Sequence, residues 1–283
     1  MLDWPKSLRV NIPANVSWKG ENTLLVRLEN AAQDIIGIRK AFHNKIMGIQ
    51  INGDLSHNPE VLKKLRGARV RVMIVEDLAK IGRNIEYYRE MLPIFTVNPD
   101  LELFKKINYL TAFGFQVHIN MTEPPHNIEL LKESLYFYLH HPLLRTPIEP
   151  FHTLLRAACS QIAATLWETE YENNKQDIYV CDNGRVTLSQ RWETADQVYG
   201  NIDTGWSELI SSPFYKKIES FKQDLFLQKS DCIFCAAFDL CGGYLRALRD
   251  DWPCAGWIEI FKILKDEARN ARTLINQQDK GRP

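Results

Sequence analysis

Four of the six cysteines lie close together near the end of the chain. They follow the pattern C-x2-C-x5-C-x12-C and are Cys232, Cys235, Cys241 and Cys254. Two cysteines separated by two residues place both sulfurs on one turn, where they can chelate the same centre. The pair Gly242-Gly243 follows the third cysteine and lets the backbone come close and direct amide groups at sulfur. We therefore expect these four cysteines to ligate a metal centre.

The spacing of the four cysteines does not by itself decide which metal they bind. Four thiolates suit a structural zinc ion or an iron–sulfur cluster. Zinc ribbons usually contain two C-x2-C knuckles, and this sequence has one. Buried thiols without a ligand are a third alternative. By spacing alone, zinc is favoured over an iron–sulfur cluster, and both are favoured over unligated thiols.

The composition is that of an ordinary packed protein. The 283 residues include 45% hydrophobic and 11% aromatic residues, with 35 basic and 35 acidic side chains. The balanced charge gives no global basic field of the kind that draws proteins to nucleic acid or anionic lipid. The sequence has no basic segment followed by an apolar run at its start, and no long apolar stretch. We expect a cytoplasmic protein that binds neither nucleic acid nor membrane.

Strand-like and helix-like segments alternate over the first 150 residues. Segments rich in β-branched or aromatic residues predict strands at 23–28, 46–51, 70–75, 92–97 and 115–120. Asn-Pro pairs open helices at 60–65 and 100–113. This alternation predicts an α/β fold built around a parallel sheet, either an open sheet or a partial barrel, because a closed barrel needs eight βα units.

A proline-rich stretch at 142–150 precedes a helix-like run at 151–170. We predict a first domain over residues 1–172 and a second over 173–283. The second contains a strand pair at 178–181 and 185–188, the cysteines, and a final helix at 257–276.

Four landmarks in the second predicted domain resemble one family when read together. The segments are VCDNGRV (180–186), YGNI (199–202), SSPFY (211–215) and CIFCAAFDLCGG (232–243). In this order they resemble the SPASM domain, the auxiliary-cluster domain of radical S-adenosylmethionine (radical SAM) enzymes that modify peptides. Upstream, YLHHP (138–142) and PIEPFH (147–152) are similar to the end of the partial barrel in those peptide maturases.

The resemblance implies a radical-SAM-like partial (β/α) barrel followed by a small SPASM-like domain. It also implies that Cys232, Cys235, Cys241 and Cys254 ligate one auxiliary [4Fe-4S] cluster. With the resemblance, iron–sulfur replaces zinc as the favoured centre.

The sequence also departs from the family in three places. The family carries C-x3-C-x2-C after its first barrel strand, yet this chain has no cysteine before Cys159, and the corresponding loop is expected at 29–34. The second-strand Gly-Gly-Glu segment is represented at best by Asn52-Gly53-Asp54. A second auxiliary cluster is not expected, because Gly205 and Leu245 stand where the family has cysteines. The chain is thus interpreted as a degenerate member, and we do not expect S-adenosylmethionine as its cofactor.

The function that we predict is that of an iron–sulfur accessory subunit. It would partner an active radical SAM enzyme in modifying a peptide or protein, by electron transfer or substrate binding. The alternative is a metal-stapled peptide-binding module, with zinc or a structural cluster and no redox role. A self-sufficient enzyme that uses acids at strand ends is a third possibility. The sequence identifies no catalytic residue and names neither the peptide nor the partner.

Other chemically capable side chains are expected to be structural. Cys159 lies among small and apolar residues of a predicted helix, and Cys181 ends a strand before a tight turn. The seven histidines show no ligand spacing. Arg246 and Arg249, with the nearby acids at 250–251, are expected to form a solvated helix face.

Overall fold

The chain forms two compact units, each assembled from separate segments. The first unit comprises residues 1–97, 108–118 and 171–220, and the second comprises 98–107, 119–170 and 221–283. The computed structural model describes residues 9–11, 24–28, 47–52, 71–75, 81–82, 85–121, 127–160, 163–170, 172–174, 177–180, 185–189, 192, 194, 196–201 and 204–280. The predicted domain boundary at 172/173 stays a prediction, because a division of the chain into spatially compact units does not test a boundary between sequence domains.

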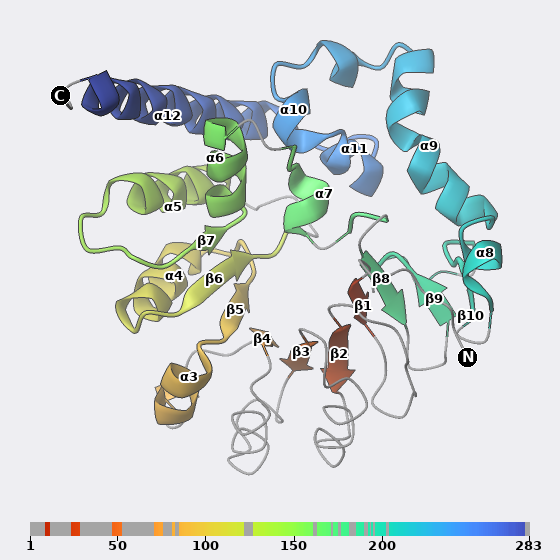
Figure 1. Ribbon diagram of the computed structural model, residues 1–283, viewed down its shortest axis with the longest axis horizontal. Coiled ribbons are helices and arrows are strands. Elements are labelled where there is room, and N and C mark those ends of the chain that lie inside the picture. Colours follow the sequence, from red (N-terminus) through yellow and green to blue (C-terminus); the bar gives the residue numbers. More distant parts are fainter. Residues whose placement is uncertain are drawn as a thin grey trace. The chain divides into compact units, whose positions relative to one another are not determined.

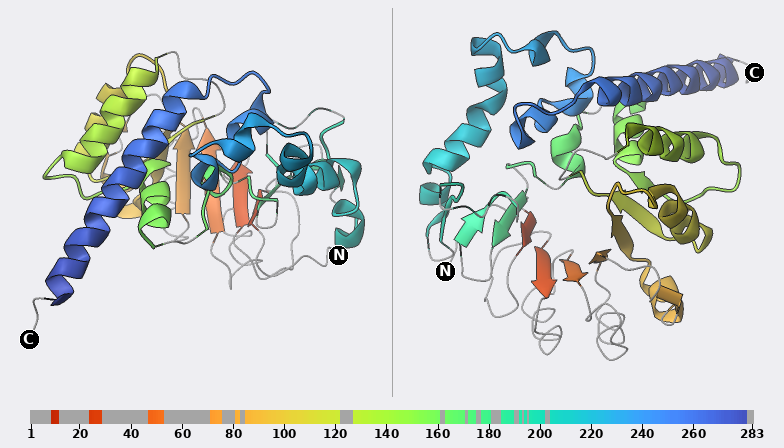
Figure 2. Two further views of the ribbon diagram at one scale, coloured as in Figure 1. Left: turned by 90° about the horizontal axis from the view of Figure 1, so that it is seen from above. Right: turned by 180° about the vertical axis from the view of Figure 1, so that it is seen from behind.

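The first unit is built around a β-sheet. Its strands are β1 (Arg9–Asn11), β2 (Leu24–Leu28), β3 (Met47–Asn52), β4 (Arg71–Val75), β5 (Ile94–Val97), β6 (Gln116–Ile119), β8 (Asp177–Val180), β9 (Arg185–Thr187) and β10 (Gly200–Asn201). They are neighbours in the order β10-β9-β8-β1-β2-β3-β4-β5-β6. The strands β2, β3 and β4 lie side by side (Figure 2, left).

Most of this sheet is parallel. Each neighbouring pair from β8 through β1 to β5 is parallel, whereas β8 with β9 and β9 with β10 are antiparallel. Strand β8, from the second half of the sequence, pairs with β1 so that Val10 lies opposite Ile178. The parallel order with helices between strands confirms the predicted α/β class.

All five strands predicted in the first 150 residues are present as β2 to β6, and the predicted pair near residue 180 is present as β8 and β9. Strand β1, which precedes them, was not predicted. The segment after β1 (12–23) and the expected segment at 29–34 both lack cysteine, so the C-x3-C-x2-C motif is absent from the given sequence whichever strand is counted first. The 29–34 loop, the predicted helix at 60–65, Gly53, Asp54 and Cys181 lie outside the described residues.

Helices in the first unit include α3 (Ile85–Met91) and α8 (Trp206–Leu209), while α4 (Leu103–Ala112) and α9 (Pro213–Leu227) give residues to both units. The core beside β5 and β6 is aromatic: the Phe95 ring lies 5.1 Å from Phe115 and 5.5 Å from Tyr88. These three side chains are almost fully buried, so they hold α3 on the sheet through apolar area and ring packing.

Two of the sequence landmarks pack against each other in the first unit. The Tyr199 ring centroid lies 5.5 Å from Phe214 and 5.1 Å from Tyr215. At Gly200, an added Cβ would lie 2.8 Å from a methyl carbon of Leu209, so only glycine fits this close approach. The YGNI and SSPFY segments thus form one packed corner, with a structural reason for their residue types.

The second unit is mainly helical. It contains β7 (Ile148–Glu149), α5 (Ile128–His140), α6 (Phe151–Ser160), α7 (Leu166–Thr169), the 3-10 helix η5 (Asp231–Phe234), α10 (Phe238–Cys241), α11 (Tyr244–Leu248) and α12 (Ala255–Lys280). The long helix α12 packs against α5 and α6 (Figures 1 and 2). Gly256 permits this approach, because an added Cβ would lie 2.3 Å from a side-chain carbon of Ile128. Among the described residues, no helix combines the length and apolarity required to cross a bilayer.

The prediction of one continuous helix at 151–170 is wrong. The structure has two helices there, because α6 ends at Ser160 and a new helix, α7, begins after Thr165. The cause is a capping box: the Glu168 carboxylate accepts hydrogen bonds from the Thr165 amide and hydroxyl at 2.6 Å. This restart places Trp167 in the core of the second unit.

Candidate metal centre

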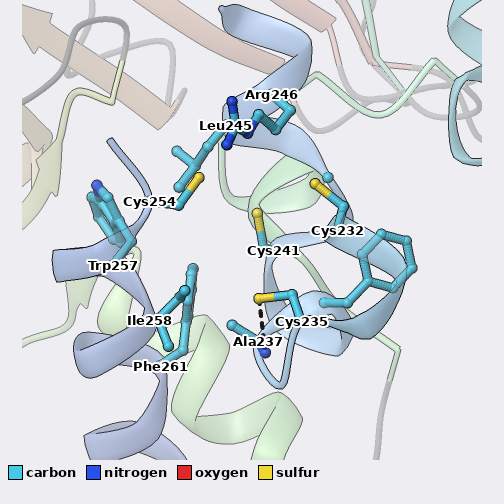
Figure 3. A pocket seen from close by; sticks show the side chains of 12 residues that line it. Cys232, Cys235, Ala237, Cys241, Leu245, Arg246, Cys254, Trp257, Ile258 and Phe261 are labelled. Atoms are coloured by element: carbon cyan, nitrogen blue, oxygen red, sulfur yellow. Dashed lines mark hydrogen bonds between the residues drawn. The ribbon is translucent and has the colours of Figure 1, made fainter. Parts of the chain in front are cut away.

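All four predicted ligands line one cavity within the second unit (Figure 3). Cys232 lies in η5, Cys235 caps the end of η5, Cys241 ends α10, and Cys254 immediately precedes α12. Figure 3 shows Cys254 on the side of α12 and the other three thiols facing it across the cavity. The fold therefore brings together side chains that are up to 22 positions apart in sequence.

The first part of the site is a tight turn. The Ser230 side chain accepts a hydrogen bond from the Cys232 amide at 3.3 Å, and the Cys235 amide donates to the Cys232 carbonyl at 3.1 Å. The Ala237 amide then donates to the Cys235 sulfur at 3.5 Å. The C-x2-C segment is thus held with both sulfurs on one turn, as the sequence predicts.

The two glycines after Cys241 are required by backbone geometry and by space. Gly242 and Gly243 both have positive φ, +62° and +77°. Residues other than glycine rarely adopt this backbone conformation. A Cβ on Gly243 would lie 2.6 Å from a methyl carbon of Leu225. In this turn the backbone amides of Leu245 and Gly243 partly offset the burial that raises the pKa of Cys241.

Buried aromatic side chains hold the turn from outside. The Trp167 indole N–H donates to the Gly242 carbonyl at 3.0 Å, and the Trp167 ring packs edge-on against Tyr244 at 5.0 Å. Lys265 of α12 donates to the Ala236 carbonyl and to the Asp239 carboxylate. The loops that carry the cysteines are therefore tied to α7 and α12 by specific polar contacts.

The wall opposite the C-x2-C turn is apolar. It includes Leu245, Trp257 and Phe261, all essentially buried. Phe234 is 82% exposed, so the C-x2-C turn lies at the surface while the other side of the cavity is lined by buried side chains. Such a shell is suited to a centre that must be shielded from water on most sides.

Burial controls the protonation of the thiols. Burial, together with the nearby Cys254 and Cys232, raises the pKa of Cys241 to about 12. Desolvation likewise raises the pKa of Cys254, while the Arg246 guanidinium acts in the opposite direction. The raised pKa values favour the protonated forms of Cys241 and Cys254 at neutral pH, so a metal centre must displace protons from these two thiols when it binds.

Arg246 was missed by the sequence analysis. It was expected to belong to a solvated helix face, yet it is only half exposed, lines the cavity, and opposes with its charge the burial that raises the pKa of Cys254. Arg249 does fit the expectation, since it is exposed and pairs with Asp251 at 2.5 Å. Both arginines lie at or next to the same short helix, α11. The sequence pattern therefore did not indicate that Arg246 alone lines the cavity.

The donor set fits a thiolate-ligated centre: four thiols, amide donors to two of them, and one cation. Within the described residues, no three His, Cys, Asp or Glu side chains lie close enough together to hold a single metal ion. Cys159 lies in α6 and does not line the cavity.

Comparison with solved structures shows that the chain has a radical SAM-like fold. The similar structure is described as native anSMEcpe with bound AdoMet, a radical SAM enzyme. Its TM-score is 0.63 at 14% sequence identity, over 90% of this chain and 85% of that chain. At this identity the likeness shows the fold alone. No protein-family model and no curated protein sequence matches the chain.

Proposed function

We propose that the chain is an iron–sulfur accessory subunit that works with an active radical SAM enzyme in modifying a peptide or protein. The observation that carries this proposal is the cavity whose wall holds Cys232, Cys235, Cys241 and Cys254. In a [4Fe-4S] cluster each thiolate binds a different iron, so thiols spread around the wall of a cavity suit such a cluster. When bound, the cluster supplies one-electron chemistry.

The residues of this chain would hold and tune that cluster. Thiolates would ligate the irons, and the amides of Ala237, Gly243 and Leu245 would donate hydrogen bonds to sulfur. These bonds and the buried wall of Trp257 and Phe261 are features that set the reduction potential of iron–sulfur centres. With four thiols available, a closed cluster for electron transfer or structure is favoured over an open catalytic one.

The accessory role rests on what the sequence lacks. No cysteine precedes Cys159, so the segment after β1, at 12–23, offers no thiol for a cluster that cleaves S-adenosylmethionine. We infer that the radical chemistry belongs to a partner. The surface position of the C-x2-C turn, marked by exposed Phe234, would bring the cluster within reach of that partner or of a bound peptide.

Metal content tests the first half of the proposal. The protein should be purified without oxygen, and iron, sulfide and zinc should be measured per chain, with visible spectra before and after dithionite. We expect about four irons, about four sulfides and an absorbance near 400 nm that bleaches on reduction. One zinc with no sulfide and no colour would replace the proposal with the metal-stapled peptide-binding module.

Association tests the second half. The chain should be co-expressed with radical SAM enzymes encoded beside its gene and with their precursor peptides, followed by size-exclusion chromatography and mass spectrometry of the peptides. We expect a stable complex and a change in the amount of modified peptide. A chain that stays alone and leaves every product unchanged would refute the accessory role while leaving the cluster intact.

A further inference from the structure

Arg246 is the single charged side chain among the twelve residues that line the cysteine cavity. It lies on α11, and its guanidinium reaches back over the cavity beside Cys254 (Figure 3). There it donates a hydrogen bond to the Asp250 carbonyl, and its positive charge opposes the burial that raises the pKa of Cys254. Since the Asp250 carbonyl accepts from the same guanidinium, the side chain is fixed in place at the edge of the cavity.

We propose that Arg246 balances the charge of the bound cluster and thereby sets its reduction potential, with Cys254 as the ligand through which it acts. This inference rests on the proposed iron–sulfur function. Arg246 is a positioning residue in this role, because it contacts a ligand of the cluster and not a substrate.

A fixed positive charge changes the relative stability of the oxidised and reduced cluster. A cluster held by four thiolates carries net negative charge, and gaining one electron adds one more unit. A fixed cation beside it favours the reduced form more than the oxidised form, and the apolar wall strengthens this effect by lowering the local dielectric constant. The amides that bond to Cys235 and Cys241 are neutral dipoles, so they cannot replace a full positive charge.

The four thiols also differ in how they are held. The Ala237 amide donates a hydrogen bond to the Cys235 sulfur, and the backbone amides of Leu245 and Gly243 oppose the rise in the pKa of Cys241 that burial causes. The positive charge that acts on Cys254 instead belongs to a side chain eight residues earlier in the sequence. A substitution can therefore remove this charge without changing the backbone of the site.

Arg249 provides a matched control. It lies three residues after Arg246, carries the same charge, is exposed, and pairs with Asp251 away from the cavity. Exposed charges in water have weak effects, so Arg249→Gln should leave the cluster unchanged.

The experiment compares the full-length wild-type protein with Arg246→Gln, Arg246→Lys and Arg249→Gln. Each is loaded with iron and sulfide without oxygen, its iron content is measured, and the reduced cluster is followed by electron paramagnetic resonance during a dye-mediated titration with dithionite. For Arg246→Gln we expect the ratio of reduced to oxidised cluster at a fixed potential to fall about tenfold, which is a shift of about 59 mV downward. Arg246→Lys keeps the charge and should stay close to wild type.

Each outcome decides the question. If Arg246→Gln folds but holds no cluster while Arg246→Lys does, the charge is needed even to retain the cluster, which supports the inference. Wild-type potential and iron content in Arg246→Gln would overturn it. So would loss of the cluster from both Arg246 variants but not from Arg249→Gln, because the contact with the Asp250 carbonyl would then be the essential one. A wild-type protein without iron or sulfide would refute the proposed function itself.

Discussion

The turn after Cys241 offers a test of the site geometry that does not touch any thiol. Replacing Gly243 with alanine introduces a Cβ at φ +77° and 2.6 Å from a methyl carbon of Leu225. The left-handed backbone costs a residue other than glycine roughly 1–2 kcal/mol. Overpacking of a well-packed core adds about 1–3 kcal/mol. We therefore expect Gly243→Ala to lower the free energy of unfolding by about 3 kcal/mol, or Tm by roughly 6–12 °C.

Gly114→Ala is the matched control for this substitution. Gly114 has nearly the same φ, +81°, but an added Cβ would meet nothing within 4 Å. It should lose only the backbone contribution, about 1–2 kcal/mol, and should bind as much iron as wild type. Gly243→Ala should also lose iron, because Gly243 lines the cavity two residues after Cys241 and its displacement would move that thiol.

The assay is urea unfolding of the metal-free proteins followed by circular dichroism, with iron content measured separately after anaerobic loading. Metal-free protein is used because a bound centre would add its own stabilisation. Equal unfolding free energies and equal iron contents for the two alanine variants would refute the claim that close packing at Gly243 shapes the site.

Three further predictions concern single side chains. Cys235→Ala should abolish iron binding while Cys159→Ala keeps it, as measured by iron and sulfide analysis; equal loss from both would place the ligands elsewhere. Trp167→Phe should lower the free energy of unfolding by about 1–3 kcal/mol in denaturant titration, because the Gly242 carbonyl loses its buried donor, and an unchanged value would contradict that bond. Burial raises the pKa of Tyr138 to about 12, above the value near 10 of an unfolded chain. The contribution of neutral Tyr138 to the free energy of unfolding is therefore complete below pH 10 and is lost as pH rises from 10 to 12. In Tyr138→Phe the free energy of unfolding, measured by denaturant titration, should fall less steeply with pH in that range. The same slope as in wild type would argue against the raised pKa.

The parts of the fold that the sequence predicts are those with a strong local pattern. The strands β2 to β6 consist of β-branched and apolar runs, and the structure places them within two residues of their predicted bounds. Strand β1 was missed because Arg9-Val10-Asn11 is short and mostly polar. Its place in the sheet depends on pairing with β8, about 170 residues away, and such non-local pairing leaves no periodic signal in a single sequence.

The candidate site likewise has a part that the sequence predicts and a part that it does not. The grouping of the four cysteines could be predicted, because their spacing and the adjacent glycines are a local pattern. The position of Arg246 at the cavity depends instead on how α11 packs. The capping box that separates α6 from α7 is present in the sequence as Thr165-x-x-Glu168. The apolar residues on both sides of it nevertheless led to the prediction of one continuous helix. Where Trp167 then lies is decided by tertiary contacts with Tyr244.

The position of Cys254 directly before α12 has a consequence for how the protein matures. A chain synthesised only as far as residue 254 would already contain every proposed ligand, yet it would lack Trp257 and Phe261, which form one wall of the cavity. It would also lack Lys265, which ties α12 to the cysteine loop. Because Trp257 and Phe261 belong to α12, which packs on α6, this wall of the cavity is complete only when the last helix has docked.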